Sequence, residues 1–161
     1  MSEYRLRPAT NQDVEKVKKL VFSVLGEYGL RPDPEGTDAD LADIEASYIK
    51  PGGIFDLMED DAGDVVGTVG LFQKGNSVCE LRKMYLVGNV RGKGLGKKML
   101  NHAITRAREL GFEKIELETA SVLKEAISLY TSYGFKKIER HLVDRCDQAY
   151  ALDILEATND I

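Results

Sequence analysis

Three glycines alternate with other residues in the segment RGKGLG, at Gly92, Gly94 and Gly96. Small residues at alternate positions let backbone N–H groups approach a ligand that a Cβ atom would hold away. The same segment carries basic side chains, namely Arg91, Lys93 and Lys97. The chemistry that suits this segment is the binding of a phosphate or pyrophosphate group.

The residues on either side of the glycine segment must position it. Residues 79–87 read CELRKMYLV, a strand-like apolar run, and residues 95–110 place apolar side chains on one helical stripe. A helix that begins at a glycine turn adds unpaired N–H donors and the positive end of its dipole. Strand, turn and helix together predict an anion site.

Two well-known phosphate-binding patterns do not fit these letters. A Walker loop ends in Gly-Lys-Ser or Gly-Lys-Thr, whereas Lys93 is followed by Gly94, and no glycine stands five residues before Gly92. The dinucleotide pattern G-x-G-x-x-G fails because its last glycine would fall on Lys97 or Met99. The segment is therefore neither a nucleoside triphosphate loop nor a dinucleotide loop.

The segment does resemble the Arg-x-x-Gly-x-Gly signature of the GNAT N-acetyltransferase superfamily, through Arg91, Gly94 and Gly96. A second stretch, AISLYTSYGF at residues 126–135, is similar to the A-x-x-L-Y-x-x-x-G-F signature of the same superfamily. With an N-terminal YRLRPAT opening and a C-terminal strand, the resemblance covers nearly all of the 161 residues. It implies one N-acetyltransferase domain, residues 1–161.

The fold that this resemblance implies is α/β, with helices flanking a central mixed and splayed β-sheet. In that fold, two neighbouring strands of the sheet diverge, namely the strand before the glycine turn and the strand after the following helix. Acetyl-coenzyme A lies between these two strands. The implied cofactor-binding residues are Met84, Tyr85, Leu86, Arg91, Gly92, Lys93, Gly94, Leu95, Gly96, Lys97, Leu123, Ala126 and Tyr130. Leu123 stands where the family usually has asparagine, so a side-chain hydrogen bond to the coenzyme is expected to be lost.

Hydrophobic periodicity predicts the elements in chain order. Strands are predicted at residues 4–7, 54–58, 65–72, 78–87, 114–119, 135–138 and 149–155. Helices are predicted at 10–28, 38–48, 95–110 and 123–133, the first two capped by Thr10 and Asp38. The strands from 54 to 87 predict an antiparallel meander, and the following strand-helix-strand order predicts a parallel crossover. The last two strands are predicted to be antiparallel across a turn at 144–147.

Acetyl transfer to an amine requires an acid and a base. An ammonium with a pKa of about 10.4 must lose a proton before it can attack, and the resemblance points to Glu80 as the base, acting through water. The alternative is a surface carboxylate paired with Arg82 or Lys83. Tyr130 falls on the tyrosine of the second signature, which implies the general acid for the departing thiolate, with simple packing as the alternative. The backbone N–H groups of residues 84–86 are expected to meet the charge on the thioester oxygen.

Composition limits the partners and the location. A net charge of −5 argues against a broad nucleic-acid or membrane-binding face. Cys79 and Cys146 are the only cysteines, and neither they nor His102 and His141 have metal-ligand spacing. With no apolar signal core at the N-terminus, we expect a cytoplasmic protein without a metal. A homodimer is compatible with this interpretation.

Residues 31–45 carry several acids and one Arg31, on the side that borders the acceptor in this fold. The acids are Asp33, Glu35, Asp38, Asp40, Asp43 and Glu45. They could attract a cationic amine, or they could only keep the loop solvated and cap a helix.

The sequence therefore predicts an enzyme that moves the acetyl group of acetyl-coenzyme A to a primary amine of a small molecule, peptide or protein. Transfer is expected to be direct, within a ternary complex. The alternative is a non-catalytic module of the same fold that binds or senses acyl-coenzyme A.

Overall fold

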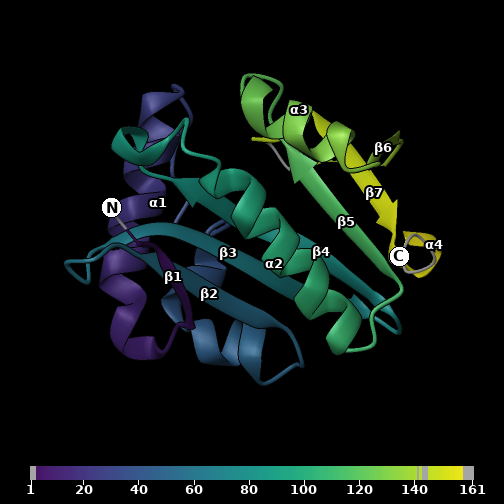
Figure 1. Cartoon of the computed structure of the whole chain (residues 1–161), viewed down its shortest axis with the longest axis horizontal. Helices are drawn as coiled ribbons and strands as arrows, with labels where there is room; N and C mark the ends of the chain where they lie inside the picture. The colour runs from purple at the N-terminus through teal and green to yellow at the C-terminus, as the bar shows by residue number, and fades with distance from the viewer. Residues whose placement is uncertain (1–2, 141, 143–144, 158–161) are drawn as a thin grey trace.

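The structure is a computed structural model that describes residues 3–140, 142 and 145–157. One seven-stranded sheet runs through the described chain in the order β1-β2-β3-β4-β5-β7-β6 (Figure 1). The strands are β1 (Arg5–Pro8), β2 (Ile54–Glu59), β3 (Val65–Gly75), β4 (Val78–Leu86), β5 (Lys114–Thr119), β6 (Lys136–Ile138) and β7 (Gln148–Asp153). His141 and Asp144, which the sequence analysis singled out, lie outside the described residues.

The sheet is mixed, as predicted. Strands β1 to β4 form an antiparallel series, β4 and β5 are parallel, and β7 is antiparallel to both of its neighbours. The predicted meander, crossover and α/β fold class are thus confirmed. The placement of β7 between β5 and β6 had no signal in the sequence.

Helices cover both faces of the sheet (Figure 1). They are α1 (Val14–Glu27), α2 (Leu95–Glu109), α3 (Lys124–Ser132) and α4 (Ile154–Ala157), with short helical turns η1 (Asn11–Asp13), η2 (Ala39–Ala42), η3 (Glu45–Ile49) and η4 (Gly88–Val90). One core packs α2 and α3 on the sheet around Met99 and Leu117. The other packs α1, η2 and η3 around Leu25 and Tyr48. No helix of the described residues is long and apolar enough to cross a membrane.

The predicted helix at residues 38–48 is wrong. The chain forms the short turns η2 and η3 there, separated at Asp43, whose φ of −144° and ψ of 87° are not helical. Asp38 does not cap a helix with its side chain. Its carboxylate instead accepts two hydrogen bonds from Arg145, at 2.7 and 2.8 Å, and lies 3.3 Å from Lys83 Nζ. These long-range ion pairs draw the segment against the sheet and override its helical periodicity.

Asp38 should contribute strongly to stability, because its side chain is 0% exposed beside two cations. We expect Asp38→Asn to lower the free energy of unfolding at pH 7 by about 3 kcal/mol, since Arg145 and Lys83 would keep buried charges without their partner. Urea denaturation of both proteins measures this difference. Equal stabilities would show that the ion pairs contribute nothing net.

The difference in free energy of unfolding between wild type and Asp38→Asn should depend on pH. Burial raises the pKa of Asp38, but hydrogen bonds from Arg145 and the Asp33 N–H and the charge of Lys83 outweigh it and hold the pKa below its usual value. A carboxyl group with a depressed pKa stabilises the fold above its unfolded pKa of about 3.9, and this stability is lost as pH falls through the folded pKa. The difference between wild type and Asp38→Asn should therefore persist down to about pH 4 and shrink below it.

Candidate active site

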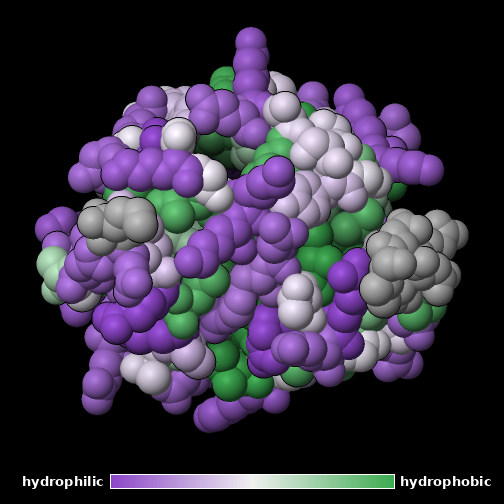
Figure 2. Space-filling view, viewed as in Figure 1, coloured by the Kyte–Doolittle hydropathy of each residue, from purple (hydrophilic) through white to green (hydrophobic). Residues whose placement is uncertain are grey.

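Two adjacent cavities lie where β4 and β5 separate. The two strands pair only along Val78–Glu80 and Lys114–Glu116, and diverge beyond them. The larger cavity has a volume of about 570 Å³ and the smaller about 290 Å³. Figure 2 shows a hollow at the top of this face, between α3 and the turn before α2. Both cavities are lined by Tyr28, Met84, Tyr85, Arg91 and Ala126, so they lie side by side.

A bulge in β4 shapes this site. Tyr85 pairs with Thr68 and Arg82 with Gly70, so Lys83 and Met84 together oppose one residue of β3. Lys83 has a φ of +55°, a left-handed conformation that residues other than glycine rarely adopt. The Thr68 hydroxyl donates a 2.6 Å hydrogen bond to the Lys83 carbonyl and so supports the bulge. The bulge redirects β4 at the point where it leaves β5.

The smaller cavity opens on the glycine turn and the N-terminus of α2. Gly92 and Gly94 have φ values of +82° and +77°, and a Cβ atom on either would meet nothing within 4 Å. The backbone is therefore bare toward open space, and the first N–H groups of α2 have no partner within the helix. A cradle of this kind fits a phosphate group.

Arg91 shapes the turn instead of reaching across it. Its guanidinium donates hydrogen bonds of 3.1 and 2.8 Å to the Leu86 carbonyl and pairs with Glu27 at 2.7 Å. It thereby ties the end of β4 to the end of α1.

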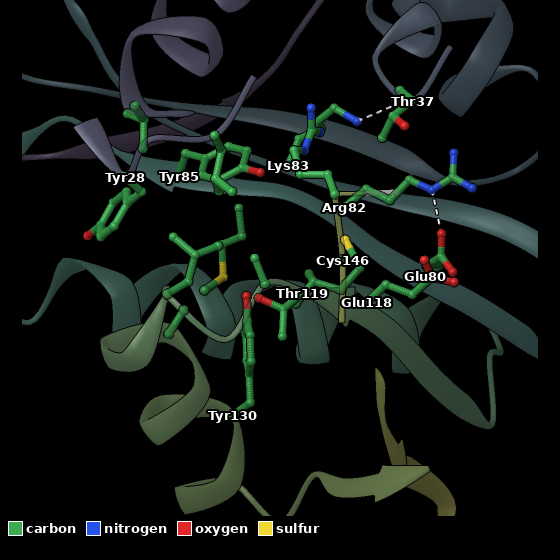
Figure 3. A pocket seen from close by; sticks show the side chains of 18 of the residues that line it. Tyr28, Thr37, Glu80, Arg82, Lys83, Tyr85, Glu118, Thr119, Tyr130 and Cys146 are labelled. Atoms are coloured by element: carbon green, nitrogen blue, oxygen red, sulfur yellow. Dashed lines mark hydrogen bonds and ion pairs between the residues drawn. The ribbon is translucent and has the colours of Figure 1, made fainter. Parts of the chain in front are cut away.

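Tyr130 reaches into the larger cavity from α3. Figure 3 shows its hydroxyl beside Thr119, with Tyr85 on the opposite wall and Cys146 close by. Burial, with smaller contributions from Tyr85 and Cys146, raises the pKa of Tyr130 well above its usual value. The hydroxyl therefore carries its proton at neutral pH.

Glu80 lies in the same cavity, and cations hold both of its oxygens. Arg82 Nε donates to one oxygen at 2.6 Å and Arg140 Nη2 to the other at 2.6 Å, with Lys74 Nζ at 3.6 Å. Burial alone would raise the pKa of Glu80, but these three cations outweigh it and lower the pKa. The group is thus an ionised carboxylate that anchors two arginines.

Comparison with known proteins places the chain in a family. The model of the acetyltransferase (GNAT) family matches residues 21–135. The chain belongs to the GNAT acetyltransferase family. An uncharacterized N-acetyltransferase of Escherichia coli K12, YjgM, is 40% identical over 139 residues, which cover 83% of each chain. The predicted family and enzyme class are confirmed.

Solved GNAT structures share the fold. A GNAT-family acetyltransferase from Staphylococcus aureus Mu50 superposes with a TM-score of 0.89 at 25% identity, over 94% of this chain and 99% of that one. A spermidine N-acetyltransferase from Vibrio cholerae, solved with CoA and spermine, has a TM-score of 0.70 at 19% identity, over 93% and 95% of the two chains.

Most residues predicted to bind the cofactor line the smaller cavity of this GNAT protein. They are Met84, Tyr85, Leu86, Arg91, Gly92, Gly94, Leu95, Gly96, Lys97 and Ala126. Leu123 and Tyr130 line the larger cavity. Lys93 lines neither, and its Nζ lies 3.4 Å from the Tyr4 hydroxyl.

Sequence reasoning missed four residues of the smaller cavity, namely Tyr28, Met99, Glu125 and Leu129. Leu129 is the leucine of the second signature and could have been found there. Tyr28 ends the helical stripe of α1, and no local pattern marks its approach to Arg91, whose Cζ lies 5.3 Å from the ring centroid. Among the described residues, no group of three or more His, Cys, Asp and Glu is placed to hold a metal ion.

Proposed function

We propose that this GNAT-family chain transfers the acetyl group of acetyl-coenzyme A to a primary amine. The observation that carries the proposal is the meeting of the two cavities at Met84, Tyr85 and Ala126. One cavity offers a bare backbone cradle for phosphates, and the other offers charged side chains for an acceptor. Two substrates bound in this way would meet beside Tyr130, without a shuttle between distant sites.

Acetyl-coenzyme A, when bound, supplies the acetyl thioester. The glycine turn, the N-terminus of α2 and Lys97 would hold its phosphates, and the β4 segment 84–86 would lie along its pantetheine arm. Tyr130 holds a proton at its hydroxyl, which a departing thiolate needs. Backbone N–H groups of the same β4 segment are the proposed donors to the thioester oxygen.

The high pKa of the Cys146 thiol favours direct transfer of the acetyl group and disfavours a route in which the enzyme is first acetylated on this cysteine. Cys146 lines the larger cavity, so it is the side chain that a covalent route would use there. Burial and, to a smaller extent, Glu118 raise the pKa of this thiol to about 11. Because only the thiolate is a good nucleophile, Cys146 is poorly suited to take the acetyl group.

A non-catalytic module that binds acyl-coenzyme A is the second candidate. It is favoured by the state of Glu80, whose lowered pKa and paired oxygens leave a weak base in the cavity. Release of free thiol from acetyl-coenzyme A across a panel of primary amines separates the two candidates, with the acetylated product identified by mass spectrometry. Coenzyme binding without thiol release from any amine would overturn the enzymatic proposal.

The role of Glu80 is open to a direct test. If it is the base, Glu80→Gln should lose most activity at low pH, where the acceptor is most protonated. Its contacts with Arg82 and Arg140 lead us to expect a different result, a loss of kcat/KM of about 10-fold that is the same from pH 6 to 9, as for a lost charged hydrogen bond. Pre-steady-state or steady-state profiles over this range give the answer.

Glu109→Gln is the matched control for that test. Glu109 pairs with Arg106 at 2.6 Å on an exposed part of α2 and lines neither cavity, so the same charge change there should leave the profile unaltered. A loss confined to low pH in Glu80→Gln would show that the Glu80 carboxylate acts as the base.

The predicted cytoplasmic location stays a prediction.

A further inference from the structure

Two cations of the larger cavity, Lys74 and Arg82, are more exposed than its carboxylates. Lys74 and Arg82 are the most accessible, with side chains 34% and 29% exposed. Glu80 and Asp40 are only 10% and 8% exposed. An acceptor that enters this cavity can therefore reach Lys74 and Arg82, whereas the side chains of Lys83 and Arg145 are only 5% and 11% exposed.

The carboxylates in this cavity form ion pairs within the protein, although Asp40 Oδ1 is buried with no hydrogen-bond partner among the described residues. Asp40 accepts a hydrogen bond from the Tyr48 hydroxyl and lies 3.2 Å from Lys83 Nζ. Glu118 accepts hydrogen bonds of 2.9 and 2.6 Å from Arg140, which also binds Glu80. Asp38 and Asp40 of the acidic segment 31–45 are paired with cations of the sheet and of the chain near β7, so part of the negative charge of the segment is offset within the protein. The cationic acceptor stays a prediction.

Arg82 is the cation best placed to bind a ligand. Its guanidinium carbon lies 3.8 Å from the centroid of the Phe72 ring, which fixes the plane of the group. Its Nε donates to Glu80, whereas Nη1 is 3.9 Å from Asp40, longer than a hydrogen bond. The Tyr48 hydroxyl is a further hydrogen-bond partner of Arg82. The Nη edge is thus held in place, and some of its N–H donors stay available to a ligand.

We propose that the acceptor amine carries a carboxylate and that Arg82 binds this carboxylate through its Nη edge, with Lys74 adding charge. A planar guanidinium matches a carboxylate with two parallel hydrogen bonds. The inference rests on the proposed function and names its class of substrate.

The position of Arg82 also limits the size of that substrate. Figure 3 shows Arg82 and Glu80 at one end of the cavity and Tyr28 at the other, with the Tyr130 hydroxyl between them. Arg82 and Tyr130 line the same cavity of about 570 Å³, so we infer that the acceptor is small, as an α-amino acid or a short amino acid derivative is.

The test compares acceptors that differ only in this group. Each common L-amino acid is assayed beside its primary amide and its decarboxylated amine, with kcat and KM measured over a pH range that corrects for the different amine pKa values. For the preferred side chain, we expect the amino acid to exceed both analogues in kcat/KM by at least about 10-fold, the scale of one charged hydrogen bond. The preference should shrink as salt rises.

Arg82→Gln assigns the preference to one side chain. We expect KM for the amino acid to rise about 10 to 100-fold while KM for the amide changes less than about 3-fold. Arg106→Gln removes the same charge on α2, outside both cavities, and should leave the preference intact. Calorimetric coenzyme affinity and the unfolding midpoint report whether Arg82→Gln keeps its fold.

Two results would overturn the inference: equal or better turnover of the amide or decarboxylated amine, or an equal loss for all acceptors in Arg82→Gln. Both leave the proposed acetyltransferase function standing. Calorimetric titration of the same acceptors into the protein with coenzyme A decides the inference independently of turnover. If no acceptor reacts, the proposed function fails, and tighter binding of the amino acid than of its amide would still support the carboxylate site.

Discussion

Gly96→Glu is expected to abolish coenzyme A binding and to leave the fold intact. The new carboxylate would enter the cradle that the glycine turn presents, where it would repel phosphates and occupy the N-terminal donors of α2. Repulsion between like charges at a binding surface costs several kcal/mol, so the affinity should fall more than about 100-fold. Titration calorimetry with coenzyme A measures the effect.

Gly96 is a cleaner site for this test than Gly94. Gly94 has a φ of +77°, so any side chain there would be strained in the protein itself. A Cβ on Gly96 would lie 3.5 Å from Leu129 Cδ2, an ordinary contact, so Gly96→Ala should fold. Its coenzyme affinity distinguishes the effect of side-chain size from the effect of the carboxylate in Gly96→Glu. Gly75→Glu is the matched control, because a Cβ there meets nothing within 4 Å and Gly75 lies outside both cavities. Unchanged affinity in Gly96→Glu would show that the turn does not face the coenzyme.

Tyr130→Phe is expected to lower kcat by about 10 to 1,000-fold, the usual range for one general acid or base. The ring would keep its place against Phe135, 5.7 Å away between centroids, so coenzyme affinity should change little. Only the protonated hydroxyl beside Thr119 would be lost. Single-turnover rates and calorimetry together distinguish chemistry from binding.

Tyr133→Phe removes a hydroxyl from the end of the same helix. Tyr133 lines neither cavity among the described residues and should keep wild-type kcat. If Tyr130→Phe also turned over at the wild-type rate, Tyr130 would have a packing role alone, and the proton for the thiolate would have to come from another group or from water.

The fold was predictable where local pattern and tertiary structure agree. Alternating strands, the glycine turn and the apolar stripe of α2 each carry their signal within a few neighbouring residues. The segment at 38–48 was not predictable, because the partner of Asp38 is Arg145, 107 residues away. No periodicity within the segment reports that contact.

The two cavities of the site also differ in whether local sequence patterns could predict them. The cofactor side is built largely from two continuous segments, the glycine turn with its flanks and helix α3, so two signatures pointed to it. The larger cavity, which is the proposed acceptor site, combines Lys74 of β3, Arg82 of β4, Glu118 of β5 and Arg145 before β7. Sequence reasoning named Arg82 only as a partner of Glu80, because the burial order of these charges exists only once the strands are aligned.

The parting of β4 and β5 gives this sheet two interior edges besides its outer ones. The outer edge strands β1 and β6 have 4 and 3 residues, and short edge strands resist pairing with other molecules. The interior edges are Leu81–Leu86 of β4 and Leu117–Thr119 of β5, which do not pair with each other, and residues of both line the cavities. An extended ligand with its own amide groups could hydrogen-bond to the backbone of these interior edges, as a neighbouring strand does elsewhere in the sheet.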